Sequence, residues 1–279
     1  AVITHNEARK PKELWTDRGT GEKIVRYFAD DEFDEANWVV ARLRDLHDKE
    51  HRKWSELAVF YRTNAQSRVL EESFIYAGLP YKVVGGTKFY DRREVKDALA
   101  YLHVAANPLD EINLKRVVNT PKRGIGESSL AKIDAYAASA GISFALALRD
   151  PAAAGVGGAA AKGMVAFNAL IDECGALIDQ GPGVVLRHAM ERSGYLAELA
   201  AEGTVESAGR EENIQELIGV ASEFTVVDEF LEQVSLVADT DELSEDNHVT
   251  LMTLHSAKGL EFPVVFIVGV EEGVFPHSR

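Results

Sequence analysis

The sequence predicts an α/β fold in which a parallel sheet is interrupted by an all-helical insertion. Strand-like and helix-like patterns alternate from residue 23 to about residue 96, which is typical of a parallel sheet covered by helices. Only helical patterns follow, up to residue 246. Two β-branched runs, 249–254 and 264–270, have the character of buried strands, so we expect them to rejoin the sheet. The predicted division is 1–96 for the first part of the sheet domain, 97–246 for the insertion and 247–279 for the return to the sheet.

The first part of the sheet domain contains three expected strands and two expected helices. The strands are apolar or β-branched runs, and the helices show apolar residues at helical spacing. A run of acids opens the first helix, as suits the positive end of its dipole, and Gly78 with Pro80 closes the second. In chain order we expect strand 23–29 (KIVRYFA), helix 31–50, strand 57–63 (LAVFYRT), helix 64–80 and strand 81–86 (YKVVGG).

The insertion is expected to be a succession of helices. Within it, residues 150–163 (DPAAAGVGGAAAKG) are low in sequence complexity, which predicts a flexible connection. The helical patterns are 94–105, 111–118, 128–140, 164–178, 183–195 and 212–224.

Composition limits what the chain can be. Its 279 residues are 46% hydrophobic and 8% aromatic, which suits about two globular domains. The net charge of −15 belongs to the insertion, where 10 Lys and Arg face 25 Asp and Glu, whereas residues 1–96 carry 18 against 17. A local basic site can still bind phosphate in such a protein, because salt screens exposed charges beyond about 8 Å.

The sequence shows neither an apolar run of membrane length nor a signal or transit pattern, so we expect a cytoplasmic protein without membrane contact. Its single cysteine, Cys174, excludes an internal disulfide and a multi-cysteine metal site. An apolar helical stripe around Cys174 favours a small core residue. The alternative is a stripe that faces another chain, in a homodimer where Cys174 forms an interchain disulfide. The stripe consists of Leu170, Ile171, Cys174, Leu177 and Ile178.

The segment 253–262 (TLHSAKGLEF) is a polar loop between two of the apolar runs. Open α/β sheets bind ligands beyond the carboxyl ends of their strands, which is where this segment is expected to lie. Although Lys258 and Gly259 invite comparison with a phosphate loop, the pattern G-x-x-x-x-G-K-[ST] is absent from the sequence. On spacing alone, a plain polar loop with a capping serine is an equal alternative.

Several segments, collinear over nearly the whole chain, resemble the UvrD/PcrA/Rep group of superfamily 1 DNA helicases. Residues 249–279 (VTLMTLHSAKGLEFPVVFIVGVEEGVFPHSR) resemble motif V and its continuation. The resemblance implies a RecA-like motor domain, 2A, interrupted by a helical 2B subdomain, in an ATP-dependent 3′ to 5′ DNA helicase or translocase that acts in DNA repair. The other matching segments are LAVFYRTNAQSRVLEE (57–72), YKVVGGTKFYDRREVKDALAYL (81–102), VVNTPKRGIGESSL (117–130) and REENIQEL (210–217).

The same resemblance assigns roles to single residues. Arg62 and Asn64 in YRTN and His255 in LHSAKG would contact single-stranded DNA, and Glu261 in GLEF would hydrogen-bond the ribose of ATP. The chemistry is compatible, because a guanidinium suits phosphate and a carboxylate accepts from ribose hydroxyls. One loop would then link a DNA contact to a nucleotide contact. The alternatives are a surface charge and a helix cap for Arg62 and Asn64, and a buried, hydrogen-bonded histidine for His255.

A second predicted DNA contact lies in TPKRGIGESSL, where Gly124 and Gly126 flank Ile125 between two helical patterns. Such a turn can present backbone N–H groups and a helix N-terminus to a phosphate, with help from Lys122 and Arg123. The segment resembles the helix-hairpin-helix-like element that contacts duplex DNA in the family. The alternative is a plain turn between two helices.

The residues Phe89 and Tyr90, after Gly85 and Gly86, permit two interpretations. They stack on bases in the first, and they pack in the core as an aromatic pair ahead of a helix in the second, which we favour.

The groups that this helicase family needs for ATP hydrolysis are absent from the sequence: the Walker A loop, the Walker B carboxylates and the arginines of motifs IV and VI. We therefore expect a fragment of a longer protein that uses ATP and Mg²⁺, with neither bound to the fragment and no ATP hydrolysis by it. The expected partners are single-stranded and duplex DNA, and repair proteins. An ATP-independent binding module and a recombination nuclease-helicase are the alternatives, and YRTNAQSR (61–68) disfavours the second.

Overall fold

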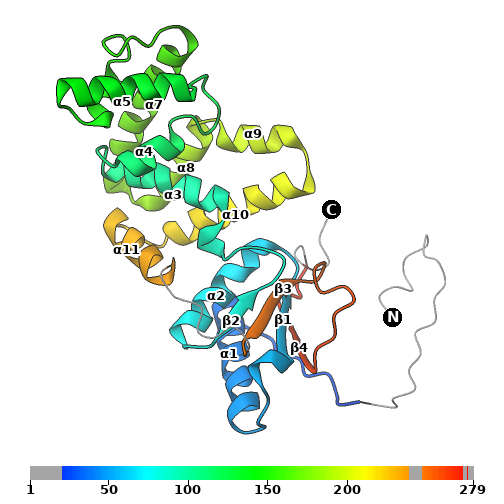
Figure 1. The fold of residues 1–279 in the computed structure, drawn as a ribbon. Helices are drawn as coiled ribbons and strands as arrows, with labels where there is room; N and C mark the ends of the chain where they lie inside the picture. Colours follow the sequence, from blue (N-terminus) through cyan, green and yellow to red (C-terminus); the bar gives the residue numbers. More distant parts are fainter. Residues whose placement is uncertain (1–20, 239–246, 273–274, 276–279) are drawn as a thin grey trace.

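A four-stranded parallel sheet forms the lower part of the molecule in Figure 1. The computed structural model describes residues 21–238, 247–272 and 275. The strand order is β2, β3, β1, β4, so both strands from the far end of the sequence flank β1. Their predicted return to the sheet is confirmed, and the fold is an α/β fold of the RecA-like kind. The strands are β1 (Leu57–Tyr61), β2 (Tyr81–Val83), β3 (Val249–Thr253) and β4 (Val264–Ile267).

Two helices, α1 (Glu32–Asp48) and α2 (Ser67–Tyr76), pack on one face of the sheet. The apolar stripe of α1 includes Val39 and Leu43, which share a core with Phe74 of α2 and with Leu57 and Val59 of β1. Successive side chains of a strand point to opposite faces of the sheet, so Ala58 and Phe60 of β1 point to the other face, where a smaller cluster lies. That second cluster consists of Ala58, Phe60, Met252 and Ala257.

The helical block, by which we mean α3 to α11, lies between β2 and β3 in the sequence and has its own hydrophobic core. Figure 1 shows it stacked above the sheet, with α5 and α7 at the far end and α10 and α11 near α2. Short 3₁₀ turns η2 (Trp54–Glu56), η3 (Asn64–Gln66), η4 (Phe89–Asp91) and η5 (Ile178–Gln180) occur in the chain. The helices of the block are α3 (Arg93–Ala106), α4 (Glu111–Val117), α5 (Glu127–Ala140), α6 (Phe144–Arg149), α7 (Gly158–Gly175), α8 (Pro182–Arg192), α9 (Tyr195–Glu202), α10 (Val205–Ala221) and α11 (Val227–Ala238).

The segment 150–163 is not the flexible connection that its composition predicts. Val156 is buried, and α7 begins at Gly158. Close packing explains the small residues, because Ala160 is buried and a Cβ on Gly163 would lie 2.3 Å from the carbonyl oxygen of Arg123. The low complexity therefore reflects the tight approach of α7 to a neighbouring turn.

The segment 23–29 does not form the predicted strand. None of the four described strands pairs with it, and the side chains of Ile24, Val25 and Phe28 are exposed. Tyr27 stacks on Trp38 of α1, with ring centroids 4.7 Å apart. Without a neighbouring strand to take its backbone hydrogen bonds, the apolar pattern alone does not produce a strand.

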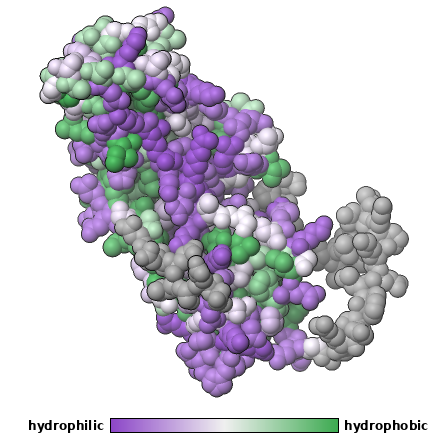
Figure 2. Space-filling model, viewed as in Figure 1, coloured by the Kyte–Doolittle hydropathy of each residue, from purple (hydrophilic) through white to green (hydrophobic). Residues whose placement is uncertain are grey.

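Most of the charge of the helical block lies at its surface. Glu94 and Asp97 are the buried carboxylates among the residues of this block that the structure describes. On the face shown in Figure 2, hydrophilic residues cover much of the middle of the block. Among the described helices, none is both long and apolar enough to cross a membrane.

Candidate nucleic-acid interface

The carboxyl ends of β1 and β3 bring two of the predicted DNA contacts together. The strands are parallel neighbours in which Tyr61 is level with Thr253, and the N–H of Leu254 donates to the carbonyl oxygen of Tyr61 at 2.8 Å. The next residues therefore emerge side by side, and Nη1 of Arg62 donates to Nδ1 of His255 at 3.2 Å. His255 is exposed, so it is not the buried histidine of the alternative interpretation.

The backbone around Arg62 is held by Gln66. The Oε1 atom of Gln66 accepts from the N–H groups of Arg62 and Thr63, both at 2.9 Å, which closes the turn that leads into α2. Asn64 is exposed at this turn. Sequence reasoning did not single out Gln66, although a Thr followed three residues later by Gln is the signature of a helix start. We call Arg62, Asn64 and His255 the strand-end site.

The loop after β3 is braced by the loop after β2. Gly85 has a φ of +80°, and a Cβ there would lie 2.7 Å from Oγ of Ser256. Oγ of Ser256 is in turn 3.0 Å from Oγ1 of Thr253. A residue larger than glycine would thus be strained at this φ and would displace the side chain of Ser256.

Glu261 lies six residues after His255 in the extended segment that leads to β4. Its side chain is exposed, and within the described residues no hydrogen bond or ion pair occupies its carboxylate. The carboxylate is therefore free to accept from a ligand, as the predicted ribose contact requires.

The second predicted DNA contact is a compact turn, residues 119–126, which we call the glycine turn. The side-chain oxygen of Asn119 accepts from the N–H groups of Arg123 at 2.8 Å and Ile125 at 3.2 Å. Gly124 has a φ of +74°, in the left-handed region that favours glycine, and the side chain of Ile125 is buried. The N–H groups of Gly124 and Gly126 donate to no acceptor among the described residues, and Gly126 directly precedes α5.

The two cations of the glycine turn face different ways. Nη1 of Arg123 donates to the carbonyl oxygens of Val117 at 3.0 Å and Pro121 at 3.2 Å, and its guanidinium lies over the rings of Tyr101 and Phe167. Arg123 thus braces the turn from inside, although the sequence suggested it as a phosphate ligand. Lys122 is exposed and is the cation that the turn presents outward.

Basic residues without a carboxylate partner gather around the glycine turn. Seven cations of the helical block form ion pairs: Arg93, Lys96, Lys115, Arg116, Arg149, Arg192 and Arg210. The other five have no carboxylate partner among the described residues: Lys122, Arg123, Lys132, Lys162 and Arg187. All but Arg187 lie on the turn, α5 or α7, and α7 packs directly on the turn through Gly163. Unpaired cations therefore gather at this part of an acidic block, with the exposed Glu127 beside them at the start of α5.

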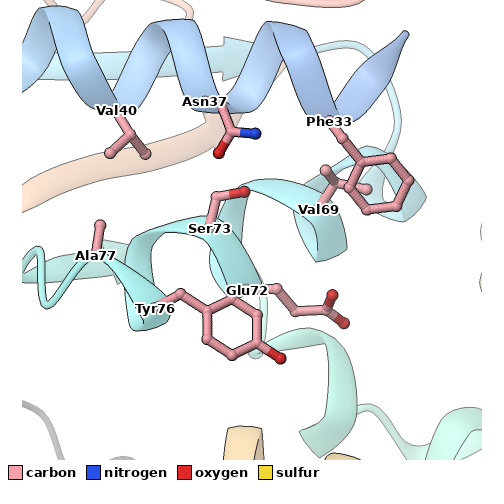
Figure 3. Close-up of a pocket in the computed structure, with 8 residues that line it drawn as sticks. All are labelled: Phe33, Asn37, Val40, Val69, Glu72, Ser73, Tyr76 and Ala77. Carbon is pink, nitrogen blue, oxygen red and sulfur yellow. The ribbon is translucent and has the colours of Figure 1, made fainter.

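Several remaining candidates belong to the core or lie outside both sites. Cys174 is fully buried, and burial raises the pKa of its thiol to about 12. Phe89 and Tyr90 are also buried in the core of the helical block, as favoured, so base stacking would require them to leave it. A separate pocket of about 350 Å³ lies between α1 and α2, where Figure 3 shows Asn37 and Ser73 pointing toward each other.

The comparison with known proteins agrees with the resemblance of the sequence motifs. The family of UvrD-like helicase C-terminal domains matches residues 1–151 and 186–279. The chain is 46% identical over 292 residues to the ATP-dependent DNA helicase PcrA of Bacillus subtilis (strain 168), an alignment that covers 100% of the chain and 40% of the relative.

Two further relatives show the same pattern. UvrD1 of Mycobacterium tuberculosis (strain ATCC 25618 / H37Rv) is 44% identical over 304 residues, covering 100% of the chain and 39% of the relative. PcrA of Staphylococcus aureus (strain NCTC 8325 / PS 47) is 45% identical over 290 residues with the same coverages, 100% and 39%. The chain spans about two fifths of the length of these curated relatives, 39% to 40%.

Proposed function

Because the chain belongs to the UvrD-like helicase C-terminal domain family, we propose that it is the DNA-gripping part of an ATP-dependent 3′ to 5′ DNA helicase or translocase that acts in DNA repair. In this proposal residues 1–96 and 247–279 belong to motor domain 2A, and residues 97–246 form the 2B subdomain. The name shared by the similar proteins, ATP-dependent DNA helicase, supports the activity, and similarity over 100% of the chain supports its assignment to this part of such a protein.

The contact between Arg62 and His255 is the observation that carries the proposal. It joins two polar segments at the ends of neighbouring parallel strands, where open α/β sheets bind their ligands. Arg62 offers several donors to phosphate oxygens, and exposed Asn64 adds an amide on the same turn. Such groups hold a nucleic-acid backbone without reading its bases, which suits a motor that moves along any sequence.

Glu261 is the proposed nucleotide contact. Its exposed, unpaired carboxylate would accept from the ribose hydroxyls of ATP on the loop segment that also carries His255. In the whole protein, hydrolysis of ATP would supply the free energy for movement along DNA, and Mg²⁺ would neutralise the charge of the phosphates. The described residues contain no group of three or more His, Cys, Asp or Glu side chains that could hold a metal ion. We expect the chain alone to hydrolyse no ATP, and DNA-stimulated hydrolysis that survives repurification would contradict this.

The glycine turn is the proposed duplex contact. Free backbone N–H groups at Gly124 and Gly126, the N-terminus of α5 and the exposed Lys122 all favour phosphate. The unpaired Lys132 and Lys162 on the adjoining helices add positive charge. These contacts would be weak, independent of sequence and sensitive to salt.

The cellular setting is part of the same proposal. The single cysteine supports a cytoplasmic location, because it suits a reducing compartment, and repair proteins are the partners we expect from the family. A homodimer through the helical block would need a surface other than the Cys174 stripe, because Cys174 is fully buried.

Binding of a labelled oligothymidine, followed by fluorescence anisotropy, tests the proposed single-strand contact. Arg62→Ala and His255→Ala should each weaken binding about tenfold or more, since losing a hydrogen bond to a charged group costs about 1.5–3 kcal/mol. Arg187→Ala is the matched control, because it removes the same charge from an exposed residue that has no carboxylate partner in the described structure. Equal losses for Arg62→Ala and Arg187→Ala, or no loss for either, would refute a dedicated site.

A further inference from the structure

Arg92 joins the strand-end site to the helical block. It directly precedes α3, where the chain passes from the sheet into the block, and its side chain is buried. Nη1 donates to the carbonyl oxygen of Asn64 at 3.0 Å and to Oδ1 of Asn213 at 2.9 Å, while Nη2 donates to Oγ of Ser67 at 2.7 Å. One guanidinium thus holds the turn that carries Arg62 through Asn64, the start of α2 through Ser67, and α10 through Asn213.

Asn213 completes this arrangement from the other side. It is buried on α10, and its Nδ2 donates to Oε1 of Glu94 at 2.6 Å, so both ends of its amide are occupied. Asn213 belongs to the segment REENIQEL, whose resemblance to a family motif gave no role for its residues. The arrangement accounts for an amide here, because only a side chain with both a donor and an acceptor can serve Glu94 and Arg92 together.

The same segment makes a second link to α2. Nε of Arg68 donates to Oε1 of Glu216 at 2.7 Å, and Nη1 of Arg68 donates to Glu72 at 3.0 Å. Burial lowers the pKa of the Arg68 guanidinium, but Glu72 and Glu216 outweigh burial and raise it above its ordinary value. Arg68 therefore stays charged, and α10 is fixed to α2 by directional contacts one helical turn beyond Asn213.

A buried polar junction of this kind fixes geometry more strictly than an apolar one. Burial lowers the pKa of Arg92, with Glu71 acting in the opposite direction, so its charge is tolerated only with its acceptors in place. Two apolar surfaces can slide past each other at little cost in free energy. A buried hydrogen-bond donor that loses its acceptor instead costs its full desolvation free energy. A shift of α10 would therefore disturb Arg92, and through Arg92 the carbonyl of Asn64 and the hydroxyl of Ser67.

We propose that Arg92 and Asn213 are positioning residues for single-stranded DNA: they hold the turn of Arg62 and Asn64 so that the docking of the helical block sets the affinity of the strand-end site. The inference rests on the proposed single-strand contact. Its consequence is that a residue of α10, 149 positions after Asn64 in the sequence and without DNA contact of its own, controls single-strand affinity while duplex affinity at the glycine turn is unaffected.

The test measures the affinity of the whole 279-residue chain for a labelled oligothymidine and a labelled duplex. Asn213→Ala should weaken single-strand binding about fivefold to tenfold, because Arg92 loses one of its acceptors, and should leave duplex binding unchanged. Ile214→Val is the matched control: it trims a fully buried residue next to Asn213 on α10, and should leave both affinities unchanged although it lowers stability.

A double-mutant cycle separates positioning from general loosening of the fold. If Asn213 acts through the turn of Arg62 and Asn64, Asn213→Ala should change single-strand affinity by less than about twofold when Arg62→Ala and Asn64→Ala are already present. Additive effects would overturn the inference. Should Asn213→Ala fail to fold, Asn213→Ser replaces it, since a hydroxyl keeps polarity but is too short to reach both Arg92 and Glu94. The same loss is expected, and normal affinity of a folded Asn213→Ser protein would overturn the inference.

The outcomes also distinguish this inference from the proposed function. Loss of single-strand binding in Arg62→Ala with normal binding in Asn213→Ala leaves the strand-end site intact and refutes the positioning role. Normal binding in both variants refutes the strand-end site and the inference with it.

Discussion

The strand-end site and the glycine turn use opposite constructions to meet the same kind of ligand. The first joins Arg62 to His255, which are 193 residues apart in the sequence, and holds their side chains at the surface. The second is built from eight consecutive residues, turns its arginine inward as a brace and leaves backbone N–H groups outside. A phosphate can thus be bound by charged side chains that the tertiary fold brings together, or by backbone donors of one short turn. Mutations should therefore affect the two sites differently.

Replacing the internal brace should have the largest effect. Arg123→Ala removes several hydrogen bonds to backbone carbonyls and a contact with two buried rings, so we expect the free energy of unfolding to fall by about 2–4 kcal/mol. Lys122→Ala removes an exposed side chain and should change it by less than about 0.5 kcal/mol. Urea unfolding followed by circular dichroism measures both. Similar small effects would show that Arg123 is not the brace.

The contact between α7 and the glycine turn offers a second comparison. Gly163→Ala should lower the free energy of unfolding by about 1–3 kcal/mol, because the new Cβ would lie 2.3 Å from the carbonyl oxygen of Arg123 and α7 must shift. Gly209→Ala, on α10 with nothing within 4 Å of the new Cβ, should instead raise it by up to about 1 kcal/mol. A stabilising Gly163→Ala would mean that the turn tolerates a displaced α7.

The reactivity of the Cys174 thiol reports how often α7 leaves the core. Since it is fully buried and its pKa is raised to about 12, it should react with a thiol reagent only when α7 leaves the core, and oxidation should give no disulfide-linked dimer. If α7 leaves the core only when the whole protein unfolds, Arg123→Ala should accelerate labelling by the same factor by which it raises the equilibrium constant of unfolding. Rapid labelling of the native protein, or a dimer band that Cys174→Ser abolishes, would place the stripe at a surface.

The sequence predicted those features that depend on local pattern or on a general rule of sheets. Helix α1 follows from its acidic start and apolar spacing, and His255 and Arg62 meet because each follows a parallel strand at the same edge of the sheet. The failed strand at 23–29 shows the limit of pattern, since strand formation depends on a partner as well as on apolar residues.

Other features depended on contacts that spacing does not reveal. The direction of Arg123 is decided by the carbonyls of its own turn and by the ring of Phe167 from α7, and the junction of Arg92 with Asn213 joins residues 121 positions apart. The prediction of a flexible connection at 150–163 was wrong for a related reason, because small residues occur in closely packed segments as well as in flexible ones. To predict whether a cation in a glycine-rich turn faces a ligand, one must therefore also consider the backbone carbonyl groups to which it can donate.

Separate affinities for single-stranded and duplex DNA test most directly whether the two sites are independent. We expect Arg62→Ala to weaken oligothymidine binding about tenfold and to leave duplex binding unchanged. Lys122→Ala should weaken duplex binding only, with the slope of log affinity against log salt reduced by about 0.9 for one lost phosphate contact. If each variant instead weakens both substrates to the same extent, the strand-end site and the glycine turn form one undivided surface, and the account given for them is wrong.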